Sequence, residues 1–173
     1  MSPKAKIALV AAVCAAPIIL GTLAYMFGWA GGASGNYGEL IAPQPLVGAP
    51  FHALRGKWVL VTFDPAACGA ECEKKLYFVR QVRRAQGKDA ERIERLWLVT
   101  DRGAPSSELT RAIEGTRIVP AEANIGKAFP GEPTQHIYLV DPLGNLIMRF
   151  PCDPEPSKVI KDLQRLLKYS HVG

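Results

Sequence analysis

The chain has 173 residues, of which 48% are hydrophobic and 21% charged, with four cysteines and a formal net charge of +5. An apolar segment of about thirty residues at the N-terminus leaves a remainder that suits one domain with one core. Beyond this segment lie 19 of the 21 basic residues and all 16 acidic ones. The excess of positive charge there is too small to indicate nucleic-acid binding.

The N-terminal segment predicts a membrane anchor. Residues 7–38 carry no charge, and the apolar stretch Ile7–Trp29 is long enough, at about 20 residues, to cross a hydrocarbon layer as a helix. A cleaved signal peptide is the alternative, but its apolar region is shorter and ends in a small-residue cleavage site. Lys4 and Lys6 precede the span and the next basic residue is Arg55, so the N-terminus is expected in the cytoplasm and the body outside. In a bacterium this predicts a single-pass inner-membrane protein with a periplasmic domain.

A glycine-rich stretch follows the expected anchor and predicts a flexible linker. The expected organisation is a membrane anchor at 1–30, a linker at 31–38 and one folded domain at 39–173. Within the domain, residues 42–50 contain three prolines and predict an irregular or edge segment.

Strand and helix patterns then alternate along the chain. An unbroken apolar run after Arg55 is typical of a strand buried on both faces of a largely parallel sheet. Amphipathic spacing predicts the helix that follows and the helix near the C-terminus, and an Asp-Pro-Leu-Gly turn predicts a hairpin. The order favours a three-layer α/β sandwich. The expected strands are 57–63, 96–99, 136–140 and 145–150, and the expected helices are 71–86, 106–114 and 156–169.

The chemical signal is the pair Cys68 and Cys72, placed just past the first central strand where a helix begins. Open α/β sheets place their sites at such strand ends. Positions four apart share one helical face, so the two α-carbons should lie roughly 6 Å apart, within disulfide range. Cys68 is expected to be the more reactive thiolate because the helix N-terminus stabilises negative charge. Cys72 is expected to be the more buried of the two.

Other interpretations of the cysteines stay open. The pair is alternatively a static structural disulfide, which an exported domain can keep, although so short a loop would stabilise the fold little. The two sulfurs can also hold one metal ion between them. Cys152 is either an unpaired surface cysteine or a resolving partner for mixed disulfides, and Cys14 lies inside the apolar anchor.

Four sequence blocks over about residues 39 to 168 resemble the Sco/SenC family of thioredoxin-fold copper chaperones, which help to assemble the copper centre of cytochrome c oxidase. The resemblance implies a thioredoxin-like fold, copper ligation by the two cysteines, and the copper-site subunit of the oxidase as partner. The membrane anchor also matches. The blocks are the glycine-lysine-tryptophan strand Gly56 to Phe63, the C-x-x-x-C pair with Leu76, the segment Thr100 to Pro105, and the strand and turn Tyr138 to Gly144.

The chain departs from this family at its third copper ligand, a histidine, where Pro133 stands here. Pro133 and Thr134 are similar to the cis-proline segment that thioredoxins place beside their cysteines, which adds Pro133 to the catalytic candidates Cys68 and Cys72. His136 lies three residues later. Because copper(I) prefers thiolates and accepts imidazole, the candidate metal ligands are Cys68, Cys72 and His136; the alternative for His136 is a hydrogen-bonded strand histidine.

Three functional hypotheses follow. The first is an assembly factor for the respiratory cytochrome c oxidase that delivers copper or keeps the cysteines of the copper site reduced. The second is a general membrane-tethered thiol:disulfide oxidoreductase for exported thiol proteins, in which Cys68 attacks and Cys72 resolves. The third is a non-catalytic binding module of the same fold, so whether the chain is an enzyme stays open.

Overall fold

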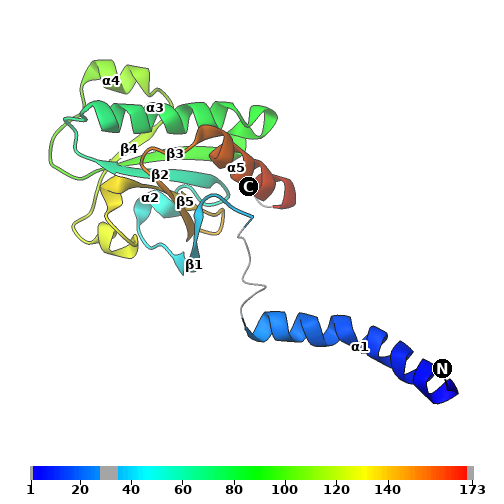
Figure 1. Ribbon diagram of the computed structural model, residues 1–173. Coiled ribbons are helices and arrows are strands. Elements are labelled where there is room, and N and C mark those ends of the chain that lie inside the picture. Colours follow the sequence, from blue (N-terminus) through cyan, green and yellow to red (C-terminus); the bar gives the residue numbers. More distant parts are fainter. Residues whose placement is uncertain (1, 28–34, 171–173) are drawn as a thin grey trace. The chain divides into compact units, whose positions relative to one another are not determined.

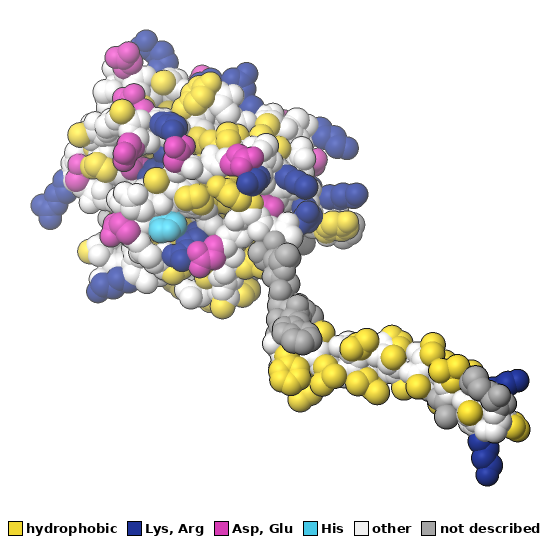
Figure 2. All heavy atoms as spheres, in the orientation of Figure 1, with side chains coloured by type: hydrophobic (Ala, Val, Ile, Leu, Met, Phe, Trp, Pro, Cys, Tyr) yellow, Lys and Arg dark blue, Asp and Glu magenta, His cyan; other side chains and the backbone are white. Residues whose placement is uncertain are grey.

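The computed structural model describes residues 2–27 and 35–170, and the chain divides into a unit of residues 1–35 and a unit of residues 36–173. The first unit is the helix α1, Pro3–Met26. Its stretch Pro3–Ala24 is the one helix within the described residues that is long and apolar enough to cross a membrane. Figure 2 shows hydrophobic side chains along α1 and lysines at its N-terminal end. The predicted span therefore stands as a candidate, while Trp29 and half of the expected linker lie outside the described residues.

The second unit is built on one mixed six-stranded sheet with the strand order β1-β6-β5-β2-β3-β4 (Figure 1). The strands β2, β3 and β4 run parallel, and β5, β6 and β1 add to the other side of β2 in antiparallel pairs. This places β2 at the centre of the sheet. The bounds are β1 Glu39–Pro45, β2 Trp58–Asp64, β3 Ile93–Val99, β4 Arg117–Pro120, β5 His136–Val140 and β6 Asn145–Pro151.

Helical segments cover both faces of the sheet. One face is covered by α3 and α5, which bury Val79 and Leu163 against Leu60 and Ile137. The other face is packed by α2 and the segment that contains η2. The predicted α/β sandwich is confirmed. The bounds are α2 Ala49–His52, α3 Ala70–Arg84, η1 Gly87–Arg92, α4 Ser107–Ala112, η2 Ile125–Ala128, η3 Pro133–Gln135 and α5 Pro156–Tyr169.

The fold creates the site where β2 ends and α3 begins. All seven residues of β2 are buried, as expected of a central strand with helices on both faces. The chain leaves the sheet after Asp64, crosses a short loop, and enters α3 at Ala70. The pair of cysteines therefore lies at the carboxyl end of the central strand, where sites of α/β sheets are found.

Candidate redox site

Cys68 and Cys72 form a disulfide, with their α-carbons 5.2 Å apart. Gly69 is the N-cap of α3 and provides no side chain to cap the first turn. Cys68 therefore lies just before the helix and Cys72 in its first turn, where unpaired backbone N–H groups favour negative charge. The predicted spacing of the two cysteines is confirmed by the bridge.

The turn before the helix has a constrained backbone. Cys68 is the one non-glycine residue with a positive φ among the described residues, at 29°, and its N–H donates to the carbonyl of Pro65 at 3.1 Å. The same loop is held by Asp101, whose Oδ1 accepts the N–H of Ala66 at 3.0 Å and that of Gly103 at 3.1 Å. A non-glycine residue in this region costs about 1–3 kcal/mol and persists only when its surroundings hold it. The loop thus presents the disulfide in one geometry.

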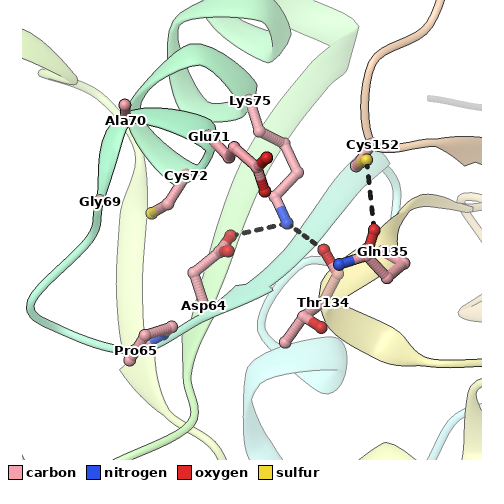
Figure 3. Close-up of a pocket in the computed structure, with 10 residues that line it drawn as sticks. All are labelled: Asp64, Pro65, Gly69, Ala70, Glu71, Cys72, Lys75, Thr134, Gln135 and Cys152. Carbon is pink, nitrogen blue, oxygen red and sulfur yellow. Dashed lines mark hydrogen bonds and ion pairs between the residues drawn. The ribbon is translucent and has the colours of Figure 1, made fainter.

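Cys72 of this disulfide borders a cavity of about 440 Å³, whose lining residues are drawn in Figure 3. Cys68 and Cys72 are both 5% exposed, so the expectation that Cys72 is the more buried is wrong. The reason is that Cys72 lies in the first turn of α3, and this turn forms part of the cavity wall. Cys72 lines the cavity together with Asp64, Gly69, Lys75, Gln135 and Cys152, whereas Cys68 is not among the lining residues.

Asp64 and Lys75 form a buried ion pair in the lining of this cavity. The Nζ of Lys75 lies 2.9 Å from Oδ2 of Asp64, and the two side chains are 2% and 9% exposed. Lys75 also donates to the carbonyls of Phe63 and Thr134. The ammonium group of Lys75 on α3 therefore bonds both to the end of β2 and to η3 (Figure 3).

Burial raises the pKa of Asp64, while the hydrogen bond and charge of Lys75 lower that pKa in part. This ion pair is not among the site residues that the sequence predicts. The signal was present, since Lys75 is three residues after Cys72 and beside Leu76, on the apolar stripe of an amphipathic helix where a lysine is rarely buried without a partner.

Pro133 is the first residue of η3. The described residues contain no cis peptide bond, so the expected cis-proline is wrong. A trans proline suits this position because its fixed φ is that of a first helical residue, where its missing N–H costs nothing. Pro133 does not line the cavity, but Thr134 and Gln135 do; a catalytic role for Pro133 stays a prediction.

His136 does not join the two cysteines. Its Nδ1 lies 2.9 Å from the carbonyl oxygen of Glu132, and its ring lies 5.8 Å from the ring of Tyr138. Tyr138 belongs to the core on the sheet face opposite α3. Because alternate residues of a strand share a face, His136 lies on that opposite side. The part of the chain that the structure describes holds no group of three or more His, Cys, Asp or Glu residues that could bind a metal.

Cys152 is a free, partly exposed thiol whose Sγ lies 3.6 Å from Oε1 of Gln135. It lines the same cavity as Cys72, but the two lie on opposite sides, with Lys75 and Gln135 between them (Figure 3). Direct exchange between Cys152 and the disulfide therefore requires movement. Cys14, the other free cysteine of the described residues, is exposed on α1.

The profile of a protein family described as "transmembrane-like, thioredoxin-like, C-terminal domain" matches residues 58–170. A comparison with curated proteins finds no match. Among solved structures, copper-bound ScoI from Bradyrhizobium japonicum is 22% identical with a TM-score of 0.56, covering 66% of this chain and 88% of that one. Copper-bound yeast Sco1 is 15% identical with a TM-score of 0.60, covering 69% and 84%.

A third similar structure is BsSco, described as a member of the Sco family of cytochrome c oxidase assembly proteins with a disulfide switch. It is 14% identical with a TM-score of 0.55, covering 78% of this chain and 96% of that one. At these identities the similarity establishes a shared thioredoxin-like fold. The resemblance to Sco/SenC that the sequence motifs predicted is thereby confirmed at the level of the fold.

Proposed function

Because the chain belongs to the family of transmembrane-like, thioredoxin-like C-terminal domains, we propose that it is a membrane-anchored thiol–disulfide exchange protein. The observation that carries the proposal is the disulfide between Cys68 and Cys72 at the start of α3, with Cys72 on the wall of a cavity. A bridge that closes a loop of three residues constrains the unfolded chain little. Its position at a cavity is therefore better explained by exchange than by stability.

The proposed partner is an exported protein with paired thiols, and specifically the copper-site subunit of cytochrome c oxidase. The similarity to Sco structures supports this choice, since BsSco is described as belonging to a family of oxidase assembly proteins. In the proposed reaction the reduced pair attacks a disulfide of the partner, forms a mixed disulfide, and then closes its own bridge while the partner leaves with two thiols. A dithiol donor outside the membrane then returns the pair to its reduced form.

The proposed location is the inner membrane of a bacterium, with α1 as a single span and the domain in the periplasm. Lys4 and Lys6 precede α1, and no further lysine or arginine occurs before Arg55, which supports a cytoplasmic N-terminus. Disulfides also persist in the periplasm.

Copper delivery to the same partner is the second candidate. Two of the similar structures are Sco proteins with copper bound, and thiolates such as those of Cys68 and Cys72 are soft ligands that suit copper(I). The fit is incomplete, because His136 lies on the other side of the sheet from α3 and does not supply a third ligand. The geometry therefore favours thiol exchange as the proposed activity.

The reduction potential of the pair tests the proposal. The full chain, purified in detergent with Cys14 and Cys152 replaced by serine, is equilibrated in thiol–disulfide buffers, and the free thiols are counted by alkylation. We expect a potential of roughly −120 to −270 mV, the range of exchange proteins, whereas a potential below about −300 mV would indicate a structural bond. Titration of the reduced chain with copper(I) against a chelator, with Cys68→Ala as control, tests the second candidate.

A further inference from the structure

The cleft between α3 and α5 holds a second cavity, of about 510 Å³, with apolar walls. Tyr77, which lines it, is 59% exposed, and Figure 2 shows hydrophobic side chains over α3 and α5 on the viewed face. Exposed apolar surface that is hollowed and has a polar rim marks a binding site. The other apolar side chains of the wall include Phe78, Pro154, Pro156 and Ile160.

This apolar cavity is continuous with the redox site. Cys152 lines both the apolar cavity and the cavity that Cys72 borders, so the two hollows meet at one side chain. Lys74, two residues after Cys72, and Asp153 also line the apolar cavity and pair with each other at 2.7 Å. A polypeptide whose sulfur reacts at the disulfide can therefore continue along the cleft.

The far end of the cleft is basic. Beyond Ala85, which lines the apolar cavity, a further cavity of about 420 Å³ lies between η1 and the C-terminal half of α5, and Lys88 and Lys168 line it. Among the described residues neither lysine forms an ion pair with a carboxylate. Asp89, the acidic residue in this lining, already pairs with Arg92 at 3.3 Å. The two ammonium groups therefore favour acidic groups on an occupant of this end.

We propose, building on the exchange function above, that this cleft recognises the exchange partner through a segment that carries an apolar side chain and then acidic residues beside its reactive sulfur. Phe78 lies six residues beyond Cys72 on α3, which is about 9 Å along a helix, and Lys88 lies roughly 20 Å away. An extended peptide covers about 3.3 Å per residue. The apolar residue therefore stands about three positions from the partner's cysteine, and the acidic residues about six or seven positions from it.

Exchange with designed peptides tests the proposal. The full chain with Cys14→Ser and Cys152→Ser is placed in uncharged lipid nanodiscs, which keep detergent out of the cleft, and its disulfide is reduced. Each peptide carries one cysteine as a mixed disulfide with glutathione. The two thiols of the chain close their bridge, and the peptide and glutathione leave as two thiols.

The peptides differ in the residues that the cleft is expected to contact, and they extend to either side of the cysteine. In the favoured direction, leucine in place of serine at about the third position should raise the second-order rate constant about tenfold. Glutamate in place of glutamine at about the sixth and seventh positions should add about threefold at low salt and nothing at about 1 M salt.

Matched variants locate these effects on the cleft. Tyr77→Ser should reduce the preference for leucine to about threefold, and Lys88→Glu should reverse the preference for glutamate. Leu143→Ser, at a position that is 65% exposed elsewhere on the domain, and Lys127→Glu on η2 should change neither preference.

The failure of the cleft and the failure of exchange give different results. Equal rates for all peptides, or preferences that Tyr77→Ser and Lys88→Glu leave unchanged, would overturn the assignment of the cleft. Closure of the bridge by glutathione disulfide would show that the exchange function is still intact. Absence of reaction with every disulfide, together with a potential below about −300 mV, would refute the exchange function itself.

Discussion

Replacing Lys75 by methionine removes the charge of the buried pair and keeps most of the volume of the side chain. Asp64, which is 6% exposed, then loses the ammonium group that lies 2.9 Å from its Oδ2. Removing one partner of a buried ion pair costs about 3–5 kcal/mol, because the remaining charge is buried without compensation. We therefore expect Lys75→Met to lower the free energy of unfolding by about 3–5 kcal/mol at neutral pH.

The neighbouring lysine provides a matched control. Lys74 pairs with Asp153 at 2.7 Å, but both side chains are about two-thirds exposed, at 65% and 68%. An exposed ion pair contributes about 0–1 kcal/mol, so Lys74→Met should change the free energy of unfolding by no more than this. The double variant Asp64→Asn/Lys75→Met removes both charges and should recover part of the loss, because no uncompensated charge then remains buried.

The cost of Lys75→Met should depend on pH. The pKa of Asp64 in the folded protein is raised above its ordinary value of 3.8, and Lys75 limits the rise; without Lys75 this pKa rises further. Between 3.8 and the raised pKa the folded state binds more protons than the unfolded state, so stability falls as pH rises through this window. The loss caused by Lys75→Met is therefore largest at neutral pH and becomes smaller as the pH falls through the raised pKa of Asp64, because the carboxyl group then takes up a proton.

Urea unfolding of the full chain in a mild detergent measures these differences through the fluorescence of the buried Trp58 and Trp97. The wild-type chain and the Lys74→Met and Lys75→Met variants are compared at about pH 7.5 and pH 5. A loss in Lys75→Met no larger than in Lys74→Met would refute the reasoning. A loss in Lys75→Met that stays the same at both pH values would show that the ionised carboxylate is not its cause.

Three further substitutions have defined expectations. Asp162→Ala removes the buried carboxylate that accepts hydrogen bonds from the N–H groups of Tyr37 and Gly38, each at 2.8 Å. The free energy of unfolding, measured by thermal unfolding, should fall by about 2–3 kcal/mol. Gly38→Ala places a Cβ onto the side chain of Met148 and should lower the free energy of unfolding by about 1–3 kcal/mol. Gly69→Ala meets nothing within 4 Å and should lower it by about 1 kcal/mol or less, the cost of replacing glycine by alanine at an N-cap. His136→Ala should change copper(I) affinity less than about tenfold in a chelator competition, because its ring contacts a main-chain carbonyl away from the cysteines.

Patterns in the sequence predicted the elements that have strong periodicity. The central strand β2, the hairpin of β5 and β6, and α5 appear within a residue or two of their expected bounds. The edge strands were harder to predict. In β1 the sequence includes Pro43 and Pro45, and β4 is four residues long and partly exposed, so neither carries the apolar run or the strict alternation by which strands are recognised.

The sequence predicted the pair of cysteines at this site but not the buried ion pair of Asp64 and Lys75 beside it. The short spacing of Cys68 and Cys72 across the start of α3 keeps them within disulfide range, although Cys68 lies before the helix and not on it. The burial of Lys75 depends on Asp64, eleven residues earlier on a different element, and no local pattern encodes that contact. The position of His136 depended on strand register, where one residue decides the face.

Copper binding and thiol exchange make different demands on the groups around Cys72. A copper(I) ion held by two thiolates gains from a third soft or imidazole ligand. Exchange needs access to one sulfur and a stabilised thiolate on the other. The cavity offers Cys72 on its wall, Cys68 at the helix start and the ammonium of Lys75 in its lining. The first two features suit exchange, and the ammonium of Lys75, which Asp64 compensates at 2.9 Å, is neutral toward it, so exchange remains the activity that we propose for the site.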